Sequence, residues 1–211
     1  MLTDEDIIII SSLDFGRVWG SRENYAIEFS NNNRVFFINP HYGVEHLLKR
    51  KWIREYRKKK EKPFYKYNKN LFIFTPPLAL PAGRYSLLID NINQKIFLKW
   101  LKKRLESFNI KNPILIIYPP WSDYLIGKFN EKISIYFCID KFSVASSGRK
   151  KKVIEENEKR LIKKVDLILT ITSHLKKYLC SITNKEIHLI FNGAQIEEIF
   201  EELSKEEKIP V

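Results

Sequence analysis

Polar and aromatic side chains gather where the short apolar runs of this chain end. The residues concerned are Asp14, Arg17, Trp19, Arg22, Tyr118, Trp121, Asp140, Ser173, Asn192 and Gly193. In an open sheet of parallel strands, the residues that follow the carboxyl ends of the strands line a cleft. Aromatic rings beside carboxylates suit a polar ligand with an apolar face, such as a sugar ring. Two arginines in the same cleft could hold a phosphate or a carboxylate.

Asp140 is the carboxylate with the strongest case for chemistry. It closes an apolar run that is broken only by Ser134. A carboxylate at the end of a strand can accept a proton from a sugar hydroxyl. The alternative is that Asp140 caps the following loop or pairs with Lys141 or Arg149. Asp14 offers the same choice between a functional and a structural role.

Motifs of several other enzyme classes are missing from the sequence. It contains no nucleophile elbow, no HExxH zinc motif, no Gly-rich dinucleotide fingerprint and no P-loop. Cys138 and Cys180 do not have the spacing of metal ligands. We therefore expect neither a bound metal nor a tightly held cofactor.

Apolar runs alternate with helix-length segments along most of the chain. The expected strands are Ile7–Leu13, Arg34–Asn39, Asn70–Thr75, Pro113–Tyr118, Lys132–Ile139, Val165–Ser173 and Ile187–Ala194. Helices are expected from Ser21, over Val44–Tyr56, Asn91–Phe108, Asp123–Phe129 and Lys151–Lys164, and between the last two strands. In the Asn91–Phe108 helix, one stripe at helical spacing is predicted to face the core, and it comprises Ile92, Ile96, Trp100, Leu101, Leu105 and Phe108. The pattern predicts a doubly wound, mostly parallel α/β sheet of about seven strands.

The positive charge of the chain is concentrated in one segment. The net charge is +12, and ten Lys/Arg but only two Glu lie between Lys49 and Lys66. The segment is either a core-facing helix with a solvated basic face or a surface that docks on an anionic membrane. The residues predicted to dock are Lys49, Arg50, Trp52, Arg54, Arg57, Lys58, Lys59 and Lys60. A nucleic-acid groove would rest on charge alone, because no recognition motif accompanies it.

The ends and the composition of the chain indicate a location. The first residues are acidic where a signal peptide would be basic, and no apolar run approaches the ~20 residues that span a bilayer. Two cysteines without a disulfide pattern fit a reducing compartment. We expect a cytoplasmic protein. If the basic segment docks on lipid, the protein would also attach peripherally to the inner face of the cell membrane.

The second half of the chain carries a motif set that resembles a known family. The set comprises Glu158-x-x-Leu161, Val165–Leu169, Thr172-Ser173-x-Leu175, Ile190–Ala194 and Phe200. It closely resembles the end of the N-terminal domain in glycosyltransferases of family 4, which have the GT-B fold. Tyr136–Asp140, Trp19-x-x-Arg22 and Asn39-Pro40 resemble earlier parts of that domain. The match runs from Ile7 to Phe200.

The resemblance implies a protein of two Rossmann-like domains. The N-terminal domain would bind a saccharide or lipid-linked acceptor, and the C-terminal domain would bind the nucleotide-sugar co-substrate. Transfer would retain the anomeric configuration without a metal. Residues 1–203 would be the acceptor domain, and residues 204–211 would be the start of the interdomain linker or a terminal helix. The donor domain would be absent from this sequence, and the fragment would be inactive alone. Glu23 and Gln195 depart from the family pattern.

The resemblance also distributes roles among the strand-end residues. Asp140 would be the catalytic or orienting carboxylate. The acceptor would contact Asp14, Arg17, Trp19, Arg22, Tyr118 and Trp121. Ser173, Asn192 and Gly193 would lie near the donor and the hinge. The rival hypothesis is a non-catalytic α/β module that binds an anionic membrane or a partner subunit.

Overall fold

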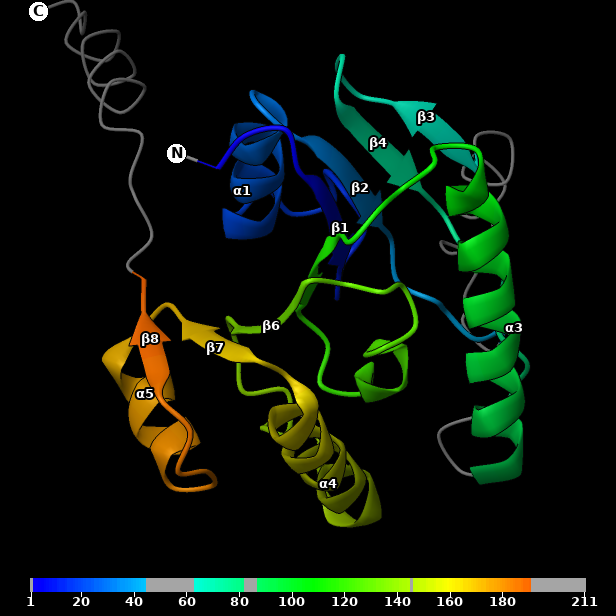
Figure 1. Cartoon of the computed structure of the whole chain (residues 1–211). Helices are drawn as coiled ribbons and strands as arrows, with labels where there is room; N and C mark the ends of the chain where they lie inside the picture. Colours follow the sequence, from blue (N-terminus) through cyan, green and yellow to red (C-terminus); the bar gives the residue numbers. More distant parts are fainter. Residues whose placement is uncertain (1, 45–62, 82–86, 145, 191–211) are drawn as a thin grey trace, which may run out of the picture.

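The computed structural model describes residues 2–44, 63–81, 87–144 and 146–190 of the chain. Within them, one eight-stranded sheet has the order β3-β4-β2-β1-β5-β6-β7-β8 (Figure 1). The strands are β1 Asp6–Ile10, β2 Arg34–Ile38, β3 Phe64–Lys66, β4 Leu71–Phe74, β5 Ile114–Ile117, β6 Ile133–Cys138, β7 Leu167–Thr170 and β8 Ile187–Leu189. The doubly wound, mostly parallel α/β fold predicted from the sequence is therefore confirmed.

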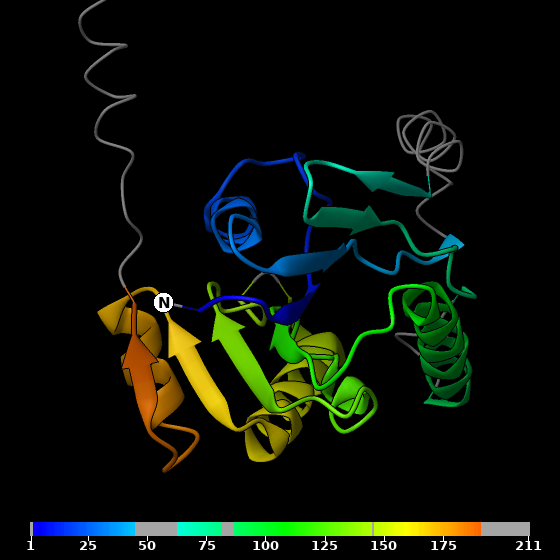
Figure 2. The same cartoon turned by 45° about the horizontal axis from the view of Figure 1, so that its top comes forward.

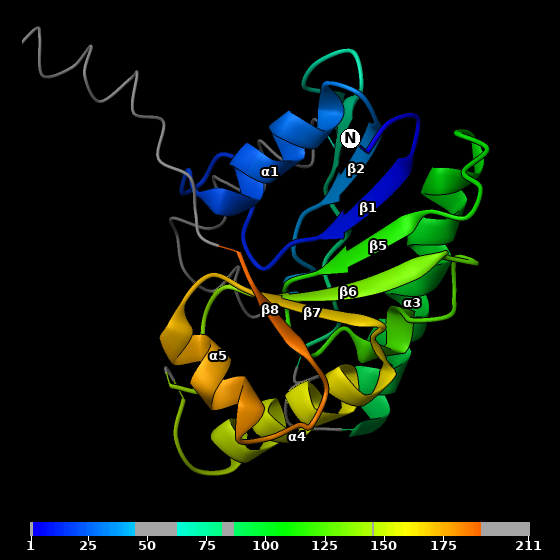
Figure 3. The same ribbon diagram turned by 60° about the vertical axis from the view of Figure 1, so that its left-hand side comes forward.

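Helices cover both faces of the sheet unevenly. Within the described residues they are α1 Ser21–Ser30, α3 Leu87–Glu106, α4 Gly148–Lys164 and α5 Ser173–Cys180, with the 3-10 turn η2 at Asp123–Leu125. On one face Ala26 of α1 packs into a core with Ile7 and Ile9 of β1. On the other face Leu101 and Leu161 contribute from α3 and α4 (Figure 3).

The strand β1 is the centre of the sheet. It pairs in parallel with β2 on one side and with β5 on the other. Its isoleucines are at most 4% exposed and point alternately to the two cores, which explains why this strand is an unbroken apolar run. Because the order of the strands reverses at β1, the carboxyl ends of β1 and β5 form the topological switch point of the sheet. Figure 2 shows the later strands β6, β7 and β8 side by side and pointing the same way.

One strand was not predicted from the sequence. β3 pairs antiparallel with β4 at the edge of the sheet, with Tyr65 opposite Ile73. Its three residues are exposed or half-buried, so they lack the apolar run that marked the other strands. These residues lie within the basic segment between Lys49 and Lys66, and the predicted count of about seven strands is one short.

The helix α3 differs from its prediction in both its bounds and its orientation. It begins at Leu87, one turn before the expected Asn91. The prediction that Ile92 and Ile96 face the core is wrong, because their exposed fractions are 41% and 40%. Leu101 and Leu105, which belong to the same predicted stripe, are buried as expected, and Phe97 joins them in the core. This helix has more apolar residues than fit on its buried face. Their spacing alone does not show which of them stay exposed to solvent.

The segment after β5 is also less helical than expected. We predicted a short helix over Asp123–Phe129, but only the turn Asp123–Leu125 forms. Gly127 has a φ of +75° and Asn130 a φ of +55°. These left-handed conformations stop a right-handed helix.

Candidate functional site

The switch point at β1 and β5 brings together side chains that are far apart in the sequence. Asp14 follows β1 and is buried, and Tyr118 directly follows β5 and is 1% exposed. The backbone N–H of Tyr118 donates to the carbonyl oxygen of Ile10 at 3.1 Å, which extends the pairing of the two strands to their ends. The first turn of α1 adds Arg22 and Glu23, both buried. This end of the sheet is the candidate functional site.

Asn39 ties the loops that follow three strands. Its Oδ1 accepts the backbone N–H of Phe15 at 2.9 Å, and its Nδ2 donates to Oγ1 of Thr75 at 2.9 Å. The ends of β1, β2 and β4 are thereby joined through one buried amide. The loop that begins with Asp14 is fixed at its base.

Tyr42 contributes to the site and was not identified from the sequence. Its hydroxyl donates to Oδ2 of Asp14 at 3.2 Å. Burial raises the pKa of Tyr42, the negative charge of Asp14 raises it further, and Arg17 opposes the shift. Tyr42 therefore stays a protonated donor to Asp14. It lies in a loop after β2, where no pattern set it apart from other aromatic residues.

Arg22 and Glu23 occupy the start of α1. Nη1 of Arg22 donates to Oγ of Ser12 at 3.1 Å. The backbone N–H of Gly20, the residue that caps α1, donates to Oε2 of Glu23 at 3.2 Å. We had noted Glu23 only as a departure from a family pattern, although its place three residues after the cap marks it as a capping residue.

Tyr118 forms one wall of this site. Its ring stacks on Phe137, with the ring centroids 5.4 Å apart. Burial is the main cause that raises the pKa of Tyr118; Arg22 lowers it, and Tyr25 and Glu23 raise it. Arg22 and Glu23 are close enough to Tyr118 to shift its pKa, so the three side chains lie near one another.

Two tryptophans present exposed rings at the same end of the sheet. Trp19 is 54% exposed and makes an edge contact with Phe15, and Trp121 is 38% exposed and makes one with Phe142. Each ring contacts a neighbouring aromatic ring and leaves part of its surface open. Such rings can stack on the apolar face of a ligand.

Asp140 is exposed at the end of β6, as its position predicted. Its backbone carbonyl accepts from Sγ of Cys138 at 3.6 Å. Among the ion pairs of the described residues, none joins Asp140 to Lys141 or Arg149. Nζ of Lys141 lies 4.0 Å from the ring centroid of Tyr178 instead. The structural alternative of a local ion pair is therefore not observed.

The remaining predicted residues fall in two groups. Ser173 begins α5 and is exposed, after Thr172, whose Oγ1 accepts the backbone N–H of Leu175 at 3.1 Å. The others lie outside the described residues, as does the linker expected at 204–211. They are Asn192, Gly193, Lys49, Arg50, Trp52, Arg54, Arg57, Lys58, Lys59 and Lys60.

The described residues contain no group of three or more His, Cys, Asp or Glu side chains that could hold a metal ion. His41 stacks on Phe97 with the centroids 5.1 Å apart, and burial lowers its pKa to about 4. His188 is exposed on β8, with Nδ1 3.8 Å from a carboxylate oxygen of Glu186. Burial raises the pKa of the Cys138 thiol to about 12, so this cysteine is not a reactive thiolate.

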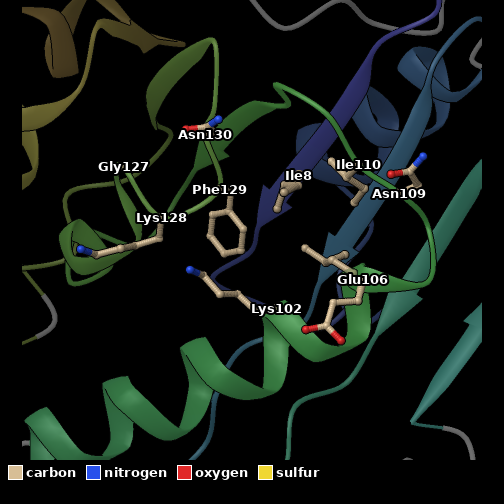
Figure 4. A pocket seen from close by; sticks show the side chains of 10 residues that line it. Ile8, Lys102, Glu106, Asn109, Ile110, Gly127, Lys128, Phe129 and Asn130 are labelled. Carbon is tan, nitrogen blue, oxygen red and sulfur yellow. The ribbon is translucent and has the colours of Figure 1, made fainter.

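A separate hollow of about 460 Å³ lies where the chain enters β5 and β6, at the end of the sheet opposite the candidate site (Figure 4). It lies between the end of α3 and the loop before β6, and Phe129 and Ile8 point into it. Lys102, Glu106 and Lys128 are its charged residues. The hollow contains none of the predicted site residues.

The eight-stranded, mostly parallel sheet is consistent with a Rossmann-like half of a GT-B fold. Sucrose-phosphate synthase of Thermosynechococcus elongatus is similar in structure. One of its chains matches with a TM-score of 0.56 and 11% sequence identity, over 95% of this chain and 96% of that one. A longer chain of the same protein matches with a TM-score of 0.62 and 11% identity, over 92% of this chain and 49% of that one. No family model and no curated protein sequence matches.

Proposed function

We propose that this chain is the acceptor-binding half of a sugar transferase. The enzyme moves a glycosyl group from a nucleotide-sugar to a cell-envelope polysaccharide or lipid-linked acceptor. The supporting observation is that Asp14, Arg22 and Tyr118 are buried at the switch point of the sheet, while Trp19 and Trp121 present exposed rings at the same end. The GT-B-like fold is consistent with this function, and sugar-binding sites commonly combine such polar groups with aromatic rings.

Each strand-end residue then has a role. Arg17 binds an anionic group of the acceptor, Trp19 and Trp121 stack on sugar rings, and Asp140 orients or deprotonates the attacking hydroxyl. The resemblance alone assigns Ser173, Asn192 and Gly193 to the donor side and the hinge. The resemblance to family 4 supports a cytoplasmic enzyme that retains the anomeric configuration without a metal and binds the nucleotide-sugar mainly through a second domain.

Replacing Asp140 with Asn tests the chemical part of this proposal. In a form of the protein that includes the donor-binding domain, we expect turnover to fall by about tenfold or more, because the amide cannot accept a proton. We expect the free energy of unfolding to change by no more than about 0.5 kcal/mol, because Asp140 is exposed. Rates of sugar transfer and urea denaturation measure the two effects. Glu106→Gln, an exposed carboxylate at the opposite end of the sheet, is the matched control. Unchanged turnover in Asp140→Asn would remove the role.

The second candidate function is a non-catalytic module that docks on an anionic membrane or on a partner subunit. The exposed face of α3 supports the membrane over the subunit. Leu88, Ile92 and Ile96 recur every fourth residue and are 74%, 41% and 40% exposed. Lys99 and Lys103 continue the same face of the helix and are exposed. Each basic residue near an anionic surface contributes about 1 kcal/mol. No helix among the described residues is long and apolar enough to cross a membrane.

Vesicle binding tests the docking surface on α3. We expect the chain to co-sediment with phosphatidylglycerol vesicles more than with phosphatidylcholine vesicles, and binding to weaken as salt screens the lysines. The double change Ile92→Asp and Ile96→Asp should weaken binding by about fivefold or more, because it adds negative charge to the face. Val144→Asp is the control, since Val144 is 73% exposed elsewhere. Equal binding to both vesicle types would contradict an electrostatic surface.

A further inference from the structure

Two charged side chains in the first turn of α1 are buried with part of their hydrogen-bonding capacity unused. Glu23 is 0% exposed and Arg22 is 7% exposed. Oε1 of Glu23 and Nε of Arg22 are both inaccessible to solvent and have no hydrogen-bond partner. An unsatisfied buried polar group costs about 1–3 kcal/mol, and more when it is charged. Native proteins keep such groups where a ligand, a water molecule or a catalytic step uses them.

Helix capping accounts for only part of this arrangement. Oε2 of Glu23 accepts the backbone N–H of Gly20, and Nη1 of Arg22 donates to Ser12. These two bonds explain one atom of each side chain. A glutamine at position 23 would cap α1 equally well without burying a negative charge. The remaining oxygen and nitrogen therefore need another explanation.

The location of the pair points to the candidate site. Arg22 and Glu23 both influence the pKa of Tyr118 at the carboxyl end of β5. The loop from Asp14 to Gly20 precedes them, and its tip is exposed at Val18 and Trp19. Gly16 in this loop has a φ of +72°, with no atom within 4 Å of where a Cβ would lie. The loop is held at its base by Asn39 and is exposed at its tip, which is the part that a ligand would have to displace to reach the pair.

We propose that Arg22 and Glu23 form a pair that recognises a vicinal diol of the saccharide acceptor; this rests on the proposed function. One hydroxyl donates to Oε1 of Glu23, and the neighbouring hydroxyl oxygen accepts from Nε of Arg22. The two charges cancel, so the pair selects a neutral polyol rather than a phosphate. The proposed function assigns the anionic group of the acceptor to Arg17, which is exposed. Glu23 is thereby a specificity-determining residue of the acceptor site.

Saccharide titration of the full chain tests the proposal. Saturation-transfer NMR would measure dissociation constants for the methyl glycosides of glucose, mannose, galactose and N-acetylglucosamine, with tetrahydropyran-2-methanol as a probe that lacks a diol. We expect at least one glycoside to bind and the diol-free probe not to bind. Glu23→Gln keeps the size of the side chain and the cap, yet should weaken glycoside binding by about tenfold or more. Arg22→Lys, which lacks Nε, should weaken it similarly.

Glu28→Gln, on the exposed side of the same helix, should bind like the unaltered chain. If Glu23→Gln changes only the melting temperature and binds normally, a buried water satisfies the pair and the inference fails, while the proposed function stands. Equal binding of the diol-free probe also overturns the inference alone. If the unaltered chain binds no glycoside, both the inference and the acceptor-binding function fail.

Discussion

Replacing Glu158 with Leu is expected to lower the free energy of unfolding by about 3–5 kcal/mol. Glu158 lies on α4 and is 1% exposed. Its Oε1 accepts the hydroxyl of Tyr136 at 2.6 Å, and its Oε2 accepts the hydroxyl of Tyr178 at 2.6 Å. One carboxylate thus joins β6, α4 and α5. Leucine removes both acceptors and leaves a buried donor behind.

The penalty comes mainly from Tyr136. This side chain is 0% exposed, so its hydroxyl has no access to water once Glu158 is gone. Tyr178 is only partly buried and can turn to solvent. Burial and the neighbouring negative charge raise the pKa of both tyrosines, so both remain protonated donors over the whole range of ordinary pH.

A rescue variant separates lost hydrogen bonds from lost packing. Urea denaturation of Glu158→Leu, Tyr136→Phe and the double variant gives their coupling energy. We expect the double variant to recover more than about 1 kcal/mol of the loss, because replacing both partners by apolar groups removes the orphan donor. Glu156→Leu, an exposed position on the same helix, is the control. Additive losses in the double variant would show that the three-element bridge contributes no specific stability.

The parallel core of the fold could be predicted from the sequence because its strands are unbroken apolar runs. Ile7–Ile10 is buried on both faces, and only a sheet covered on both faces requires such a run. Because strands alternate with helices along the chain, only a few arrangements of the strands in the sheet were possible. The edge strand β3 was not predicted, because a strand that pairs on one side only does not need an apolar pattern, and Phe64–Lys66 has none.

The candidate site was predictable only as a set of strand ends. Asp14, Tyr118 and Asp140 follow strands β1, β5 and β6, as their runs predicted. Tyr42 and Glu23 were missed for different reasons. Tyr42 reaches Asp14 from a loop, so its partner is fixed by tertiary contacts alone. Glu23 lies inside a helix, where a charged residue is ordinarily solvated, and its burial depends on the loop that precedes α1.

Lowering the pH from 7 to 5 is expected to destabilise the protein through His41. Burial lowers the pKa of His41 from its ordinary value of 6.5 to about 4. Between these two values the unfolded chain binds a proton that the folded chain does not, so stability falls as the pH falls through this window. The contribution of this one residue at pH 5 is about 2 kcal/mol. Above pH 6.5 both states are neutral, and the effect vanishes.

His41→Phe isolates this effect from the titration of the carboxylates. Phenylalanine keeps a ring against Phe97 and removes the nitrogen Nε2, which is buried without a partner. The variant and the unaltered chain share every other titrating group, so the difference between their free energies of unfolding reports His41 alone. We expect this difference to move by about 2 kcal/mol in favour of the variant between pH 7 and pH 5. His188→Phe, at an exposed histidine, should show no such movement. A difference that is constant with pH would mean that His41 is protonated as readily in the folded chain as in the unfolded one.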